Sequence, residues 1–155
     1  MPLIKDVVDA IHEILDLNLN TLLVEEELPE IRRFIFGEKE LEQLQDTPVI
    51  YIFGQRSRIE GWRSINHTQP GWDATHEVDI GIVIEHENSD VIRRQLYDYT
   101  RLIATTVIDA YPADLQQFFP RGEIQIEVSP LIANNSIFMG DARVKFFLQR
   151  VETRE

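Results

Sequence analysis

Two acidic residues stand two positions apart in an alternating stretch, Glu77-Val78-Asp79-Ile80. Side chains two positions apart on a strand project to the same face, so Glu77 and Asp79 could hold a magnesium ion together. The plainer interpretation is that both acids, with Glu85, form the solvated or partner-facing side of a half-buried strand. Polar residues at alternate positions are what that sheet geometry requires without any catalysis.

The segment upstream, Phe53-Gly54-Gln55-Arg56-Ser57-Arg58, strengthens the catalytic interpretation because it resembles the glycine turn of nucleotidyltransferases. Such enzymes hold magnesium with paired carboxylates like Glu77 and Asp79. This chain departs from the pattern in three ways. Gln55 stands where the family has serine, the acids follow the turn at a much greater distance, and Gly81 occupies a place where a further acid could help. A nucleotidyltransferase-like enzyme is therefore the alternative hypothesis.

Other catalytic and metal-binding arrangements are not supported by the sequence. The four histidines, at positions 12, 67, 76 and 86, share no metal-ligand spacing, and the chain has no cysteine. A disulfide, a thiolate nucleophile and a cysteine zinc site are thereby excluded. No phosphate loop, nucleophile elbow or dinucleotide fingerprint occurs. We therefore expect no enzymatic activity, no cofactor and no metal.

The composition predicts one soluble domain spanning residues 1–155. Its 43% hydrophobic residues can supply a core, and no apolar stretch approaches the roughly 20 residues of a membrane span. The 27 acidic residues outnumber the 15 basic ones, for a formal net charge of −12. Such a charge disfavours a surface that holds nucleic acid through its phosphates.

The acidic residues are concentrated in the first third of the chain. Residues 1–46 contain 12 acidic and 4 basic residues and form an acidic, helical N-terminal segment. Apolar residues recur at helical spacing from Ile4 to Leu15, which predicts an amphipathic helix. A weaker helical stretch follows over residues 38–45 and ends before Pro48.

From Val49 onward the apolar period changes to two. We expect strands over 49–53, 76–86, 123–129 and 142–151, the third with Ile124, Ile126 and Val128 inward. A helix with Ser89 as its N-cap should run to a point before Pro112. The predicted fold is α+β, with a mainly antiparallel four-stranded sheet, helices packed on one face and a long inter-strand arm. Residues 76–155 would supply a strand-helix-strand-strand unit.

Residues 54–75 form the predicted arm, a long connection between two strong strands. The arm contains both tryptophans, Trp62 and Trp72, and three of the seven glycines. Connections of this length without structure of their own are usually functional or disordered. Tryptophan and arginine are enriched at interface hot spots, so the arm is predicted to dock on a partner. Alternatively, the tryptophans pin the segment back on its own sheet. The candidate inter-subunit residues are Trp62, Trp72, Arg56, Arg58, Arg63 and Phe147.

The order of elements resembles the tail terminator, or tail completion, proteins of long-tailed bacteriophages. The resemblance rests on the N-terminal helix, the proline-led strand Pro48-Val49-Ile50-Tyr51-Ile52, the arm, and the strand from Val78 to Ile84. It continues with the Tyr-x-Tyr helix at Tyr97 and Tyr99 and the closing strand Arg143-Val144-Lys145-Phe146-Phe147-Leu148.

This resemblance implies a virion structural protein of the tail or neck, assembled in the host cytoplasm and without enzymatic activity. Its subunits would form a homo-oligomeric hexameric ring that contacts the tail tube protein and a head-completion or neck protein. DNA would pass the lumen without tight binding, and Glu77, Asp79 and Glu85 are the candidate lumen residues, with the acids of the first helix as the other possibility. The acidic insert Val24-Glu25-Glu26-Glu27-Leu28 leaves another head-tail connector or completion protein open.

Overall fold

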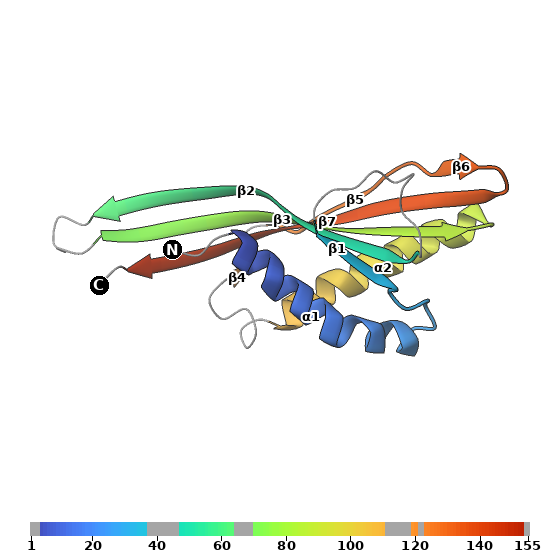
Figure 1. Cartoon of the computed structure of the whole chain (residues 1–155), viewed down its shortest axis with the longest axis horizontal. Helices are drawn as coiled ribbons and strands as arrows, with labels where there is room; N and C mark the ends of the chain where they lie inside the picture. The colour runs from blue at the N-terminus through green and yellow to red at the C-terminus, as the bar shows by residue number, and fades with distance from the viewer. Residues whose placement is uncertain (1–3, 37–46, 64–69, 111–118, 121–122, 154–155) are drawn as a thin grey trace.

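The computed structural model describes residues 4–36, 47–63, 70–110, 119–120 and 123–153 (Figure 1). Its centre is a seven-stranded sheet in which β1, β2, β3, β7 and β4 follow one another, while β5 and β6 also pair with β7. The strands are β1 (Arg33–Phe36), β2 (Val49–Arg63), β3 (Pro70–His86), β4 (Phe119–Pro120), β5 (Gln125–Val128), β6 (Ile132–Asn134) and β7 (Ile137–Thr153).

The four-stranded, mainly antiparallel sheet expected from the sequence is wrong. Within the described residues the sheet has seven strands and is mixed, because β1 runs parallel to β2 while the other pairs are antiparallel. The strands that the sequence did not reveal are β1, β4 and β6, with four, two and three residues. Segments this short carry too few positions to establish an alternating period.

Two helices, α1 (Ile4–Glu25) and α2 (Ser89–Ala110), pack on the same face of the sheet (Figure 1). The first is longer than the predicted span of Ile4 to Leu15, because Leu19 and Leu23 continue its buried stripe. It ends where Glu27 adopts a φ of 59° and the Leu28 amide donates to the Leu23 carbonyl at 2.8 Å. This bond closes the helix end in the manner of a Schellman motif.

The start of α2 differs from the prediction by one residue. The side chain of Asn88, not Ser89, caps the helix, because its Oδ1 accepts from the amides of Asp90 and Val91 at 2.9 and 3.3 Å. Further along α2, the buried Tyr99 donates to the Pro29 carbonyl at 2.6 Å. This bond ties the second helix to the segment that follows the first.

The core lies between the helices and the sheet. Alternate residues of β2, β3 and β7 face the helices and are fully buried, among them Ile52, Ile80 and Val144. These three residues stand opposite one another on adjacent strands, so the buried positions are in register across the sheet. In the described ranges the helix-free face carries a small apolar cluster, formed by the buried Ile35, Val49, Tyr51 and Val83.

The segments 123–129 and 38–45 were expected to form a strand and a helix. The strand predicted over 123–129 is shorter, and Ile126, expected to point inward, is 51% exposed near the sheet edge. The helical stretch predicted over 38–45 lies outside the described residues. No helix in the described ranges is long and apolar enough to cross a membrane.

Candidate functional site: the arm and the helix-free sheet face

The predicted arm is a continuation of the sheet. Strands β2 and β3 pair antiparallel from Val49↔Val83 to Arg63↔Pro70, and β7 pairs along β3 as far as Gly71↔Thr153. The three strands extend past α1 and α2 (Figure 1). Residues 54–63 and 70–75 are therefore strand, and residues 64–69 lie outside the described part of the chain. The sequence concealed this because Ile59 is the one apolar residue from Arg56 to Glu60, so this stretch shows no apolar alternation.

A β-bulge separates the body of β2 from its arm portion. The register shifts between Gly54 and Arg56, so Gln55 is the extra residue on β2. A bulge bends a strand and increases its local twist. Gly54 also lies close to Ile4 of α1, since a Cβ there would stand 2.4 Å from that side chain. The arm thus begins where the first helix meets the sheet.

The arm portion of β2 is exposed to an unusual degree. Every residue from Gln55 to Gly61 is exposed, although successive strand side chains point to opposite faces. On its outer edge, β2 pairs with β1 only from Val49 to Ile52, and the described residues supply no further partner there. The backbone groups of this edge are available for pairing with another chain, which makes it an interaction-prone edge strand.

The candidate interface residues lie along this arm. Arg56 forms a 3.6 Å ion pair with Glu77 across the strands, and Arg58 forms a 2.6 Å pair with Glu60. Trp62 pairs with Gly71, and Trp72 pairs with Gly61. Arg63 is the last described residue of β2, and the side chains of Arg63 and both tryptophans are outside the described part. Phe147 is partly buried on β7, opposite Glu77. The structure thus places all six residues on the three strands that form the arm.

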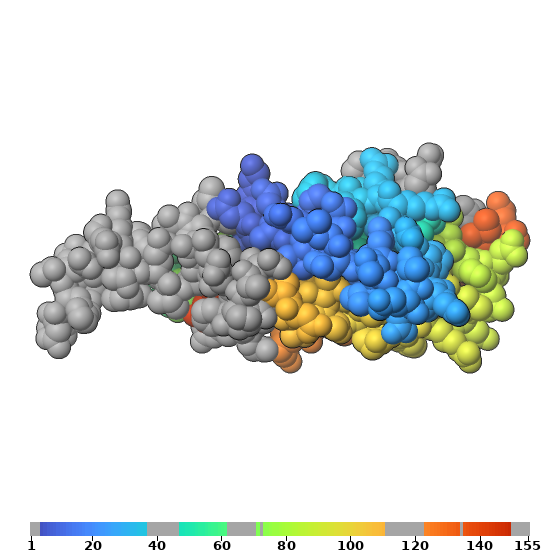
Figure 2. Space-filling model, turned by 90° about the horizontal axis from the view of Figure 1, so that it is seen from below, coloured from blue at the N-terminus to red at the C-terminus, as the bar shows by residue number. Residues whose placement is uncertain are grey.

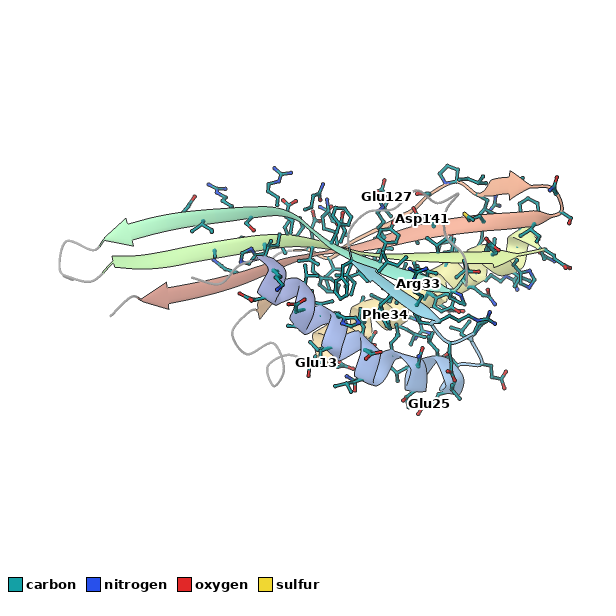
Figure 3. All side chains as sticks on the ribbon, viewed as in Figure 1. Glu13, Glu25, Arg33, Phe34, Glu127 and Asp141 are labelled. Carbon is teal, nitrogen blue, oxygen red and sulfur yellow. The ribbon has the colours of Figure 1, made fainter. Side chains whose placement is uncertain are left out.

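On the helix-free face of the body, a tyrosine spans three strands. Tyr51 of β2 lies over Gly81 of β3, where a Cβ would stand 1.9 Å from the tyrosine Cζ. Its hydroxyl donates to Asp141 Oδ1 of β7 at 2.9 Å and accepts from Arg143 Nε at 3.0 Å. Gly81 is therefore the residue that lets Tyr51 cross the middle strand. Figure 3 shows Asp141 and Glu127 on the side of the sheet away from α1.

The candidate lumen residues differ greatly in exposure. Glu77 and Asp79 face the same side, as alternation predicts, but the Asp79 side chain is only 4% exposed. Its Oδ1 lies 4.0 Å from Lys145 Nζ and has no hydrogen-bond partner among the described residues. Glu85 is exposed at the far end of β3. Asp79 thus presents almost no surface to solvent, whereas Glu85 does.

Burial disfavours the charged forms of two carboxyl groups on this face, those of Asp79 and Asp141. Burial raises the pKa of the Asp79 carboxyl, and the charges of Lys145 and Arg143 oppose the rise. Burial likewise raises the pKa of Asp141, against the effect of the Tyr51 hydrogen bond. A polar cavity of 420 Å³ opens beside Asp79, and its other lining residues are Gln55, Gln125, Ile126, Glu127, Arg143 and Lys145.

A separate polar contact lies at the root of the arm on the helix face. His76 is fully buried, and its Nδ1 lies 2.7 Å from the Ser57 hydroxyl. Burial lowers the pKa of His76, while the charge of Asp6 on α1 opposes that shift. The sequence pattern predicts His76 only as the first residue of a strand.

The arrangement does not favour metal chemistry at Glu77 and Asp79. Each carboxylate already faces a cationic side chain, Arg56 or Lys145, and Tyr51 covers the position of Gly81 where a third acid could stand. No group of three or more potential metal ligands gathers within the described ranges. The cross-strand charges can instead hold the strands in register.

Comparison with known proteins gives a distant structural likeness. No family model matches the chain, and no curated protein matches it. Among solved structures, a chain in the virion of a native gene transfer agent particle aligns over 92% of this chain and 91% of its own length. The sequence identity is 13% and the TM-score is 0.41.

Proposed function

We propose that this protein is a structural subunit of a phage-like particle, a tail terminator that self-assembles into a ring capping the tail tube and joining it to the neck. The alternative is another head-tail connector or completion protein, which would also assemble through an extended arm. The observation that carries the proposal is the arm, whose outer strand is exposed on both faces and along one edge from Gln55 to Gly61.

The outer edge of β2 is long and has no strand partner in the described residues beyond Ile52. Nine residues, Gln55 to Arg63, extend for roughly 30 Å at the rise of a strand, and soluble proteins avoid leaving such edges open. Pairing with a neighbouring subunit would cover it. A ring is built from heterologous contacts, so the arm of one copy would meet a different surface of the next.

The proposed role involves no catalysis. The carboxylates Glu77 and Asp79 face cations of the chain itself, and this pairing supports a structural use of both acids. The competing hypothesis, a nucleotidyltransferase-like enzyme, requires them to bind magnesium and a nucleotide. Calorimetry with magnesium and each nucleoside triphosphate should show no heat beyond dilution. Binding that disappears in Asp79→Asn would favour the enzyme instead.

Removal of the two tryptophans tests the arm as the interface. In Trp62→Ala/Trp72→Ala we expect the chain to stay folded, with unchanged circular dichroism, and to lose its assembled form in size-exclusion chromatography with light scattering. The matched control is Ile126→Ala/Ile132→Ala, which removes two exposed apolar side chains outside the arm. An unchanged assembly profile of the tryptophan variant would overturn the arm as the subunit contact.

A further inference from the structure

The outer edge of the arm is an open strand whose midpoint is Ile59. Strand β2 pairs with β1 only as far as Ile52, so in the described ranges the edge from Gln55 to Arg63 has no partner. Figure 2 shows α1 and α2 side by side on one face of the body, and the strands of the arm run on past them (Figure 1). The helices lie on a face of the sheet and not along this edge, so a strand of another molecule can approach it.

The side chains along this edge complement themselves when the chain direction is reversed. Arg58 and Glu60 stand one position before and one position after Ile59, on the same face of the strand. When two identical edges pair antiparallel with Ile59 at the centre, each Arg58 stands opposite Glu60 of the other copy. Ile59 then stands opposite itself, and Arg56 stands opposite position 62, a tryptophan. Opposite charges and apolar pairs directly across an antiparallel ladder stabilise it.

The ion pair already present in the arm is compatible with this arrangement. Arg58 lies 2.6 Å from Glu60 of its own chain, and their side chains are 78% and 59% exposed. An ion pair this exposed contributes little by itself. In the antiparallel pair of edges, the two arginines and two glutamates alternate as a closed set of four. Each charge then has an opposite charge along its own strand and another across the contact, so the pairing adds ion pairs without breaking one.

The charges also select the register of the two edges. Moving the centre by one residue, to Arg58 or to Glu60, sets that residue opposite its own copy, and like charges directly opposite destabilise a ladder. The centre at Ile59 avoids this repulsion. It also pairs the whole open edge of both copies, because Ile59 is the midpoint of Gln55 to Arg63. The side-chain pattern and the extent of the open edge thus point to the same register.

We propose that, before the ring forms, the arms of two copies of this chain pair edge to edge in this register as a twofold-symmetric dimer. This inference rests on the proposed role of the arm in assembly and names what covers the arm of the free chain. The contact is isologous and therefore closed, so it does not propagate to further copies. It also covers an edge that would otherwise pair with other strands. The same backbone groups cannot serve a dimer partner and a ring neighbour at once, so the dimer opens before the arm enters the ring.

A single cysteine tests the register, because the chain has no cysteine of its own. In Ile59→Cys the two thiols stand directly opposite each other, and the Cα spacing of about 4.5–5.5 Å across an antiparallel ladder is within the range of a disulfide. We expect mild oxidation of the folded chain to link it into dimers on a non-reducing gel. Ser57→Cys and Gly61→Cys should each stay unlinked alone and link when mixed, since the register sets position 57 opposite position 61. Ile132→Cys, at an exposed position outside the arm, gives the background.

Exchange of the two charges tests the contact without a cysteine. In Arg58→Glu, glutamates meet across the contact, and we expect the protein concentration at half-dimerisation to rise about tenfold or more. The exchanged variant Arg58→Glu/Glu60→Arg restores opposite charges in the same register and should dimerise like the wild type. The control Arg93→Glu makes the same charge change at an exposed position on α2 and should leave dimerisation unchanged. Light scattering over a range of protein concentration measures all four proteins.

The outcomes separate the dimer from the ring. If Ile59→Cys links no more than the Ile132→Cys background, the arm dimer is overturned, and larger assemblies of the wild type would still support the ring. An exchanged variant that dimerises no better than Arg58→Glu also overturns the dimer. Linked dimers of Ile59→Cys, in a protein whose wild type never exceeds two subunits, support the dimer and contradict ring formation by the isolated chain. A wild type that is monomeric at every concentration overturns both proposals.

Discussion

The hydroxyl of Tyr51 on β2 donates to Asp141 on β7 at 2.9 Å, across the full width of the intervening strand β3. This contact is possible because Gly81 has no side chain beneath the ring. The two residues lie 90 positions apart in sequence, so the bond joins the first long strand to the last. It orders the helix-free face of the body at the point where the arm begins.

Removal of the Tyr51 hydroxyl should destabilise the fold. In Tyr51→Phe the buried Asp141 loses one of its hydrogen-bond donors and Arg143 loses an acceptor, and a hydrogen bond to a charged group contributes about 1.5–3 kcal/mol. Denaturant titration of the purified variant measures this loss as a lower midpoint. The control is Tyr97→Phe, at an exposed position, where the change should stay within about 0.5 kcal/mol. Equal stability of both variants would contradict a structural role for the Tyr51 bond.

Addition of a methyl group at Gly81 should also destabilise the fold, and through the same ring. In Gly81→Ala the new Cβ would overlap Tyr51, and overpacking of this kind typically costs about 1–3 kcal/mol. The cost should fall sharply when Tyr51→Ala is already present, because the ring is gone. A double-mutant cycle of unfolding free energies measures this coupling. A cost that is the same in both backgrounds would show that Gly81 serves some purpose other than admitting Tyr51.

Stability should respond to the charge of Asp79. Because burial raises its pKa in the folded state, the charged form is disfavoured at neutral pH and the protonated form is favoured in acid. The wild type should therefore gain stability relative to Asp79→Asn as the pH falls from neutral toward the unfolded-state pKa of 3.8, and lose that advantage as the pH rises. Unfolding free energies across this range check the sign. Glu123→Gln, at an exposed carboxylate, should show no such trend.

The acidic composition leads to a prediction about DNA. Phosphate affinity comes mainly from lysine and arginine, and this chain has 27 acidic against 15 basic residues. We expect no mobility shift of duplex DNA even at low ionic strength, as suits a ring whose lumen lets DNA pass. A shift at micromolar protein would contradict weak binding. Of the candidate lumen residues, Glu85 is exposed and suits that role, whereas the buried Asp79 does not.

The sequence predicted the parts of the fold whose periodicity is long. The buried stripe from Val7 to Leu15 and the alternation from Val78 to Ile84 each repeat over several positions, and both elements are present. The short strands β1, β4 and β6 could not be predicted, because their pairing depends on partners far away in the chain. The strand character of this part of β2 was concealed because residues 55–61 are exposed on both faces, which removes the alternation that identifies a strand.

The site was only partly accessible from sequence. Composition marked residues 54–75 as interface-like, because tryptophan and arginine concentrate there, and the spacing of Glu77 and Asp79 placed both acids on one face. The Tyr51–Gly81–Asp141 contact was not predicted. Nothing in the local pattern around Tyr51 indicates a partner 90 residues away, and the pattern around Gly81 indicates only that an acid is missing there. Cross-strand contacts of this kind follow from register, which the sequence alone does not determine.

The most direct test of self-assembly is the molar mass of the isolated wild-type chain, measured by multi-angle light scattering over a wide range of protein concentration. A closed ring predicts a mass that rises with concentration and then holds at one integer multiple of the 18.1 kDa subunit, which is six if the ring is the hexamer that the family resemblance implies. A mass that remains at 18.1 kDa at every concentration would contradict the account.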